Sequence, residues 1–291
     1  MLSNFPSILN RWKRGVLATI WLVVRGRRGV ELEAFPDQQA HSIADCSAIQ
    51  NAVDFHLDHL GNLWVLDTGV VDALERPRCT CPPKVVVISI TLRRLTKHIQ
   101  LTSIEASSLL QNIVVEHGIG KAFVYISDAS RGAVLVHDTS SDAQWSVIVC
   151  APAPALQLAL VKRTTHTVLI IARLHQQGLL ELDTATFKRR NSLSPLSVFG
   201  EHSTPVIILG SDFHHVYLRH SCCCDVLGWN TREVYNSSRL ENFHSPGPGL
   251  TPTSVTRDPF KHVLLVLDSN YADTVSSKTA TYHRITFIDQ W

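Results

Sequence analysis

Long hydrophobic runs are missing from this sequence: no stretch reaches the roughly 18 consecutive apolar residues that a membrane-spanning helix needs. We therefore expect no membrane span. The apolar run Val16–Val24 follows Lys13 and Arg14, an arrangement that loosely imitates the charged and apolar regions of a signal peptide. Because Arg25-Gly26-Arg27-Arg28 ends the run without a small-x-small cleavage site, a buried strand is the better interpretation.

An excess of charge of one sign is also missing. The chain has 27 Lys and Arg against 25 Asp and Glu, so its formal net charge is only +2. This balance gives no reason to propose nucleic acid as a partner. The basic residues Arg25, Arg27 and Arg28 form a short local group, which a solvated turn explains better than a phosphate site.

The familiar catalytic motifs are absent as well. The sequence contains no nucleophile elbow, zincin motif, phosphate-binding loop or dinucleotide fingerprint. Gly247-Pro248-Gly249 is a loop, because no Lys-Ser/Thr pair and helix follow it. We therefore predict no catalytic residue and no cofactor.

What the sequence does contain is a repeat. One series of β-rich runs is anchored at Lys84, Gly132, Gly178 and Asp225, with steps of 48, 46 and 47 residues. A second series precedes most of these runs, and its steps from Tyr125 onward are 43, 48 and 47 residues. Its members are Leu63–Asp67, Phe123–Asp128, Val168–Ile171, Val216–Leu218 and Val263–Asp268.

A period in the mid-forties with several short strands per unit is typical of a propeller blade. We predict an all-β fold, a single β-propeller domain over residues 1–291 with about six blades. The first blade has to lie within residues 1–45, so it is expected to be abbreviated or incomplete. The possible exception to the strands is residues 104–115, where Leu109, Leu110 and Ile113 have helical spacing.

Three carboxylates stand where strands of the second series end: Asp67, Asp128 and Asp268. Equivalent strand ends gather at one face of a propeller channel, so these groups, together with Asn270, are candidates for binding a cationic ligand. The alternative is that each aspartate caps a turn by accepting backbone N–H groups.

Histidine and cysteine cluster at one place. His214, His215 and His220 stand near the consecutive cysteines Cys222–Cys224, which imitates a soft-metal site. Adjacent cysteines cannot easily turn three thiolates toward one tetrahedral centre, and the repeat predicts a hairpin turn here. We therefore expect no metal.

Several segments resemble the yellow/major royal jelly protein family. The strongest are Leu63–Gly69 followed by Cys81–Val87, and Tyr125–Ala129 followed by Arg131–Val136. Two further segments resemble the yellow-g type, which is associated with insect eggshell; they are Ile207–Asp212 and Leu267–Asp273.

This resemblance implies a secreted six-bladed propeller whose first blade is truncated in this chain. Secretion gives meaning to the glycosylation sequon at Asn236. It also favours a disulfide, Cys46 with Cys81, over a metal site at Cys79-Thr80-Cys81.

Three functions remain open. The first is a non-enzymatic role in an extracellular matrix such as eggshell or cuticle, with matrix components as partners. The second is binding of small aromatic amines in the channel, where Asp67, Asp128 or Asn270 would pair with the ammonium group. The third is an enzyme, either dopachrome-converting or a metal-dependent lactonase.

Overall fold

The computed structural model describes most of the chain: residues 5–8, 11, 13–27, 29–189, 197–199, 204–212, 214–258, 263–270, 273, 276 and 282–289. Arg28 and residues 271 and 272 of the yellow-g-like segment lie outside this part. By its internal contacts the chain divides into two compact units. Unit 1 comprises residues 1–106 and 110–115, and unit 2 comprises residues 107–109 and 116–291.

Unit 1 begins with a three-stranded antiparallel sheet in the order β1-β2-β3, whose strands are β1 (Phe5–Ile8), β2 (Ile20–Gly26) and β3 (Gly29–Ala34). The short 3-10 helix η1 (Gln39–His41) follows. The second half of the apolar run that imitates a signal peptide, Ile20–Val24, lies in β2, where Ile20 and Leu22 are buried, as expected for a strand of the core. Arg27 is exposed at the turn between β2 and β3.

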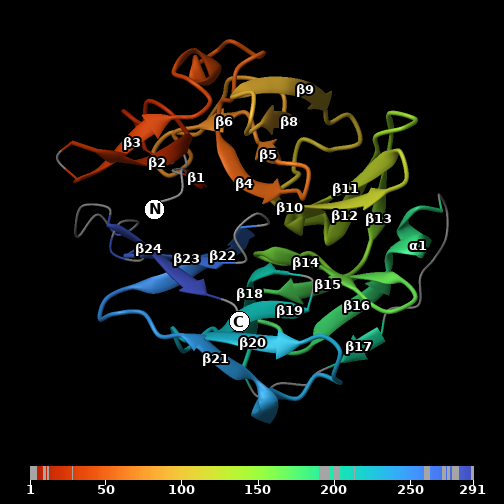
Figure 1. Cartoon of the computed structure of the whole chain (residues 1–291). Coiled ribbons are helices and arrows are strands. Elements are labelled where there is room, and N and C mark those ends of the chain that lie inside the picture. The colour runs from red at the N-terminus through yellow and green to blue at the C-terminus, as the bar shows by residue number, and fades with distance from the viewer. Residues whose placement is uncertain are drawn as a thin grey trace. The chain divides into compact units, whose positions relative to one another are not determined.

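The second sheet of unit 1 has the order β4-β5-β8-β9 (Figure 1). Its strands are β4 (Ala52–Leu57), β5 (Asn62–Asp67), β8 (Lys84–Ser89) and β9 (Arg94–Gln100). A small ribbon of β6 (Val70–Val71) and β7 (Arg78–Cys79) lies in the connection from β5 to β8. Alternate residues of β5 and β8, such as Leu63, Val65, Val86 and Ile88, join Ile20 in the core of the unit.

Strand β10 (Leu110–Gly118) crosses the boundary between the units. It belongs to a sheet in the order β10-β11-β12-β13, with β11 (Lys121–Asp128), the 3-10 helix η2 (Ala129–Arg131), β12 (Ala133–Asp138) and β13 (Ala143–Ile148). The helical spacing noted at residues 104–115 was therefore misleading. The consecutive β-branched residues Ile113, Val114 and Val115, all buried, favour a strand over a helix.

Three further sheets of unit 2 repeat the same up-and-down order (Figure 1). The first contains β14 (Leu156–Lys162), β15 (Thr167–Arg173), β16 (Leu179–Asp183), the helix α1 (Thr184–Phe187) and β17 (Ser197–Phe199). The second contains β18 (Val206–Ser211), β19 (His215–His220), β20 (Val226–Asn230), the 3-10 helix η3 (Ser237–Arg239) and β21 (Glu241–His244). The third contains β22 (Thr251–Asp258), β23 (Val263–Ser269) and β24 (His283–Asp289).

Both sequence series correspond to strands of one kind each. The first series is β8, β12, β16 and β20, the third strands of their sheets, and the second series is β5, β11, β15, β19 and β23, the second strands. These central strands read as nearly continuous apolar runs because both of their faces are buried. The all-β prediction is confirmed, and the sheets are antiparallel meanders of the β-propeller type. Among the described residues, no helix is long and apolar enough to span a membrane.

Candidate functional site

Asp67, at the end of β5, is fully buried and makes only internal contacts. Its two carboxylate oxygens accept the backbone N–H groups of Gln50 and Asn51 at 2.8 and 2.9 Å and that of Gly69 at 2.9 Å. The Lys84 ammonium, also buried, lies 2.9 Å from Oδ2. Asp67 thus ties the segment before β4 to the end of β5 and to the start of β8.

Asp128 occupies the same place at the end of β11. Its carboxylate accepts the backbone N–H of Leu109 at 3.0 Å, the Ser130 hydroxyl at 2.9 Å and the Ser108 hydroxyl. The side chain is buried, and it holds the segment that leads into the sheet. Here no cation faces the carboxylate from the neighbouring strand, where Ala133 is its register partner.

Asp268, near the end of β23, repeats the ion pair of Asp67. Its Oδ2 accepts Nη2 of Arg284 at 2.8 Å and lies 2.9 Å from Nε2 of His244. Arg284 is the register partner of Asp268 on the next strand, as Lys84 is of Asp67. Two sheets therefore use the same second-strand carboxylate and third-strand cation.

Asn270 closes the loop between β23 and β24. Its backbone N–H donates to the carbonyl oxygen of Tyr282 at 3.2 Å, and its Oδ1 accepts the Tyr282 N–H at 2.7 Å. Asp67, Asp128 and Asn270 thus accept backbone N–H groups, as turn-capping side chains do, whereas the partners of the Asp268 carboxylate are the side chains of His244 and Arg284. The part of the four residues proposed from the sequence in ligand binding remains a prediction.

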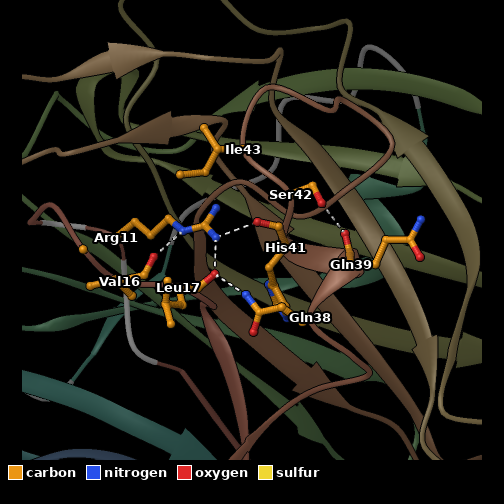
Figure 2. Close-up of a pocket in the computed structure, with 9 residues that line it drawn as sticks. Arg11, Val16, Leu17, Gln38, Gln39, His41, Ser42 and Ile43 are labelled. Atoms are coloured by element: carbon orange, nitrogen blue, oxygen red, sulfur yellow. Dashed lines mark hydrogen bonds between the residues drawn. The ribbon is translucent and has the colours of Figure 1, made fainter.

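Unit 1 contains an open pocket of about 640 Å³, a volume that falls in the range of small-molecule sites (Figure 2). Its wall combines the exposed apolar side chains of Leu17 and Ile43 with the polar side chains of Gln38, Gln39 and Ser42. Sequence reasoning missed this pocket, because the segments that line it carry no motif.

Arg11 lines this pocket, but its guanidinium is fully engaged in hydrogen bonds within the fold. Its guanidinium donates to the carbonyl oxygens of Val16, Leu17, His41, Ile49 and Gln50, so that all five N–H donors are used. Burial lowers the pKa of Arg11, and nearby Asp67 and Asp72 oppose that effect. No donor of this group is left for a ligand.

His41, the other ionisable residue of the pocket, is held in one tautomer. Its Nε2 donates to the carbonyl oxygen of Phe35 at 2.8 Å, and its Nδ1 accepts the Thr19 N–H at 3.4 Å. Burial lowers the pKa of His41, which favours the neutral imidazole. The ionisable side chains of the pocket are therefore held by internal hydrogen bonds, and the rest of its lining is apolar surface, side-chain amides and the Ser42 hydroxyl.

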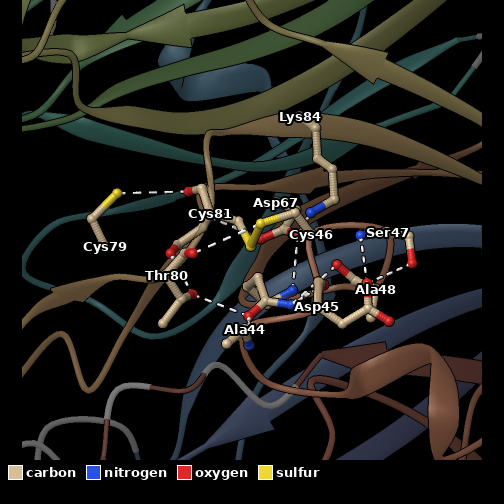
Figure 3. Close-up of a disulfide and its surroundings, with 12 residues drawn as sticks. Ala44, Asp45, Cys46, Ser47, Ala48, Asp67, Cys79, Thr80, Cys81 and Lys84 are labelled. Atoms are coloured by element: carbon tan, nitrogen blue, oxygen red, sulfur yellow. Dashed lines mark hydrogen bonds and ion pairs between the residues drawn. A yellow bond between two sulfur atoms is a disulfide. The ribbon is translucent and has the colours of Figure 1, made fainter.

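Cys46 and Cys81 form a disulfide, the pair that the family resemblance implies (Figure 3). Closing a loop of this length stabilises a fold by about 3–4 kcal/mol in the chain-entropy model. Cys79 is an exposed thiol whose Sγ lies 3.6 Å from the carbonyl oxygen of Cys81. Cys81 is thereby committed to a disulfide and not to a metal.

The three consecutive cysteines of the His and Cys cluster fall at the turn between β19 and β20, as the repeat predicts. Cys222, Cys223 and Cys224 are exposed free cysteines in this turn. His214 and His215 lie at the opposite end of β19. In the part of the chain that the structure describes, no group of three or more His, Cys, Asp or Glu residues is arranged to hold a metal ion.

These sheets define the class of protein: an all-β chain of propeller-type meanders. Two solved structures share this arrangement, and both are auxiliary nutrient binding proteins. The protein from Bacteroides ovatus has a TM-score of 0.54 at 11% identity and matches over 93% of this chain and 64% of its own. The protein from Bacteroides thetaiotaomicron has a TM-score of 0.51 at 9% identity, over 99% of this chain and 69% of its own. At such identities the likeness concerns the fold alone.

Sequence comparison points to one family. Residues 50–157 match the family model "Major royal jelly protein". Dopaminechrome tautomerase of Drosophila melanogaster is 28% identical over 146 residues, which are 47% of this chain and 32% of that protein. Protein yellow of the same species is 28% identical over 145 residues, 46% of this chain and 26% of that protein. The match thus spans about a third or less of each relative's length.

Proposed function

We propose that this chain is a secreted member of the yellow/major royal jelly family, of the yellow-g type, whose six-bladed propeller serves as a structural component of an extracellular matrix such as eggshell or cuticle. Its partners are other matrix components. The family match at residues 50–157 supports the first part of this proposal. The chemistry of the cysteines supports the second.

The exposed thiols are the observation that carries the structural role. The disulfide Cys46–Cys81 belongs in an oxidising compartment, where unpaired thiols do not persist. Four free cysteines are exposed, namely Cys79, Cys222, Cys223 and Cys224. Exposed cysteines left over in a secreted protein are expected to pair with another chain. The exposed thiols can therefore cross-link the protein into a matrix through disulfide bonds.

The strand-end carboxylates agree with such a role. Asp67, Asp128 and Asp268 each spend their oxygens on holding loops and neighbouring strands in place. Residues used in this way make a stiff scaffold. We also propose that Asn236, whose side chain is exposed, carries a glycan in the secreted protein.

The cross-linking is tested by oxidising the secreted full-length chain in air and separating the products on a non-reducing gel. We expect disulfide-linked oligomers that collapse to monomer with a reductant. A variant with all four exposed cysteines changed to serine should stay monomeric, whereas Cys150→Ser, a half-buried thiol, should behave as the native chain does. Native protein that stays monomeric after oxidation in air would overturn the proposal.

The second candidate is tautomerisation of an aminochrome, and the observation that favours it is the similarity to dopaminechrome tautomerase. Such a reaction moves a proton between two positions of the substrate, so it needs an acid–base group within reach. The test is the decay of dopaminechrome absorbance with and without the folded chain. Acceleration in proportion to protein concentration would establish the enzyme, and no acceleration would leave the structural role.

A further inference from the structure

The turn between β19 and β20 concentrates three thiols in three consecutive residues. Its backbone is closed by Cys223, whose N–H donates to the carbonyl oxygen of His220 at 3.2 Å, and by Ser221, which donates to Pro205 at 2.9 Å. All three cysteine side chains are exposed. Small oxidants and thiols therefore reach them freely.

The geometry selects one pair of the three. The sulfur atoms of Cys222 and Cys223 are 3.2 Å apart, closer than the roughly 3.5–4.0 Å optimum for non-bonded heavy atoms. The sulfur of Cys224 is directed elsewhere, since it lies 3.9 Å from the hydroxyl oxygen of Thr251 at the start of β22. Cys222 and Cys223 are thus already placed side by side.

We propose that Cys222 and Cys223 are a redox-active vicinal dithiol, which closes to a disulfide by exchange with a low-molecular-weight disulfide such as oxidised glutathione. The Cys222 thiolate attacks one sulfur of that compound, whose S–S bond breaks and releases one thiol. Cys223 then attacks the mixed disulfide and releases the second thiol. The pair loses two electrons and two protons, and the small disulfide is reduced to two thiols.

This order of attack follows from the hydrogen bond between the two sulfurs. The contact with Cys222 raises the pKa of the Cys223 thiol, and the neighbouring Asp225 and Cys224 act in the same direction. Cys223 therefore keeps its proton longer and serves as the resolving thiol.

The resulting disulfide is expected to be reversible. Neighbouring Cα atoms are about 3.8 Å apart, whereas most disulfides join Cα atoms about 4.4–6.8 Å apart. A vicinal bond is therefore strained and easily reduced. The Cα atoms of Cys46 and Cys81 are 5.4 Å apart, within the usual range, so that disulfide serves as an internal reference. The inference holds whether the protein is structural or catalytic.

The test places the secreted full-length chain in glutathione buffers of graded oxidation, blocks free thiols by alkylation, and weighs the tryptic peptide of residues 220–232. Trypsin cleaves after Arg219 and after Arg232, and the peptide between these two cuts contains the three consecutive cysteines. We expect a peptide with one alkyl group and one internal disulfide to replace the triply alkylated peptide. The Cys46–Cys81 peptide should remain oxidised throughout, which reports that the fold is intact.

Three matched variants decide which pair reacts. Cys224→Ser should keep the native midpoint, whereas Cys222→Ser and Cys223→Ser, which each leave a different pair, should need a buffer about tenfold more oxidising. One midpoint shared by all three variants would overturn the proposal. So would a native peptide that stays triply alkylated or that only accumulates bound glutathione.

Discussion

At the scale of single residues, Asp67 of unit 1 combines a buried ion pair with hydrogen bonds to the backbone. Its carboxylate accepts three backbone N–H groups and faces a lysine that is as buried as itself. Removing one partner of a buried ion pair costs more than the pair contributes, because the other charge is left without compensation. The same reasoning applies to Asp268 with Arg284, although Arg284 is more exposed.

We predict that Asp67→Asn lowers the free energy of unfolding by about 3–5 kcal/mol, since it leaves the Lys84 ammonium buried and unpaired. Urea unfolding followed by tryptophan fluorescence measures the loss. The double variant Asp67→Asn with Lys84→Met should recover part of it. As a control, Glu33→Gln, which breaks the exposed pair with Arg93, should change stability by no more than about 1 kcal/mol. Equal losses at Asp67 and Glu33 would contradict this account.

Asp54 on β4 is expected to make the free energy of unfolding depend on pH. Burial raises the pKa of this carboxyl to about 7, although hydrogen bonds from Ile113 N–H, the Phe55 backbone and Asn112 oppose the rise. The folded state therefore binds the proton more tightly than the unfolded chain does. Stability is then highest at low pH for this group and falls as pH rises from about 4 to about 7.

We predict that Asp54→Asn removes this fall, which is on the order of 1–3 kcal/mol for a partly buried group. The asparagine oxygen still accepts the Ile113 N–H, so the variant should be more stable than the native chain at pH 8 and little changed at pH 4. Urea midpoints at both values measure the difference. The exposed Glu31→Gln serves as the control, and an Asp54→Asn variant that keeps the native pH profile would refute the assignment.

At the scale of elements, glycines set the tight connections between strands. Gly132 ends η2 with a φ of 59° and leads into β12. A Cβ atom there would collide with the carbonyl oxygens of Cys150 and Ala151. Gly120, in the turn between β10 and β11, has a similar φ of 69°, but a Cβ atom would meet nothing within 4 Å.

We predict that Gly120→Ala costs about 1 kcal/mol, the strain of a left-handed alanine. Gly132→Ala should cost about 3 kcal/mol or more, because strain and collision act together. Thermal and urea unfolding of the two variants give the comparison. Similar costs at the two positions would show that the backbone around Gly132 yields easily.

The strands themselves were predictable from the sequence, and the reason is local. β8, β12, β16 and β20 are short apolar runs bounded by polar turns and repeated at a nearly constant interval. In the region of β10, the spacing of Leu109, Leu110 and Ile113 indicates a helix, whereas the β-branched run Ile113–Val115 favours the strand that the structure has. A short segment carries too few residues for periodicity alone to separate helix from strand.

At the scale of the whole molecule, contacts between residues that are distant in the sequence could not be predicted from the sequence. The ends of the second strands could be located, but not the partners of their carboxylates: His244 lies 24 residues before Asp268. The pocket at Arg11 was hidden for the same reason, since its guanidinium binds carbonyl oxygens up to 39 residues away. Every residue has a backbone carbonyl, so the pattern of side chains does not indicate which carbonyl oxygens Arg11 will bind.

A structural role requires that the protein resides in the extracellular matrix and is held there by disulfide bonds. Eggshell and cuticle can be extracted in sequence with salt, detergent, urea, and finally urea with a thiol reductant, and the chain followed with an antibody. We predict that it stays in the insoluble matrix until the reductant is added. Recovery in the salt or detergent fractions, or inside cells, would contradict the proposal that this is a cross-linked component of an extracellular matrix.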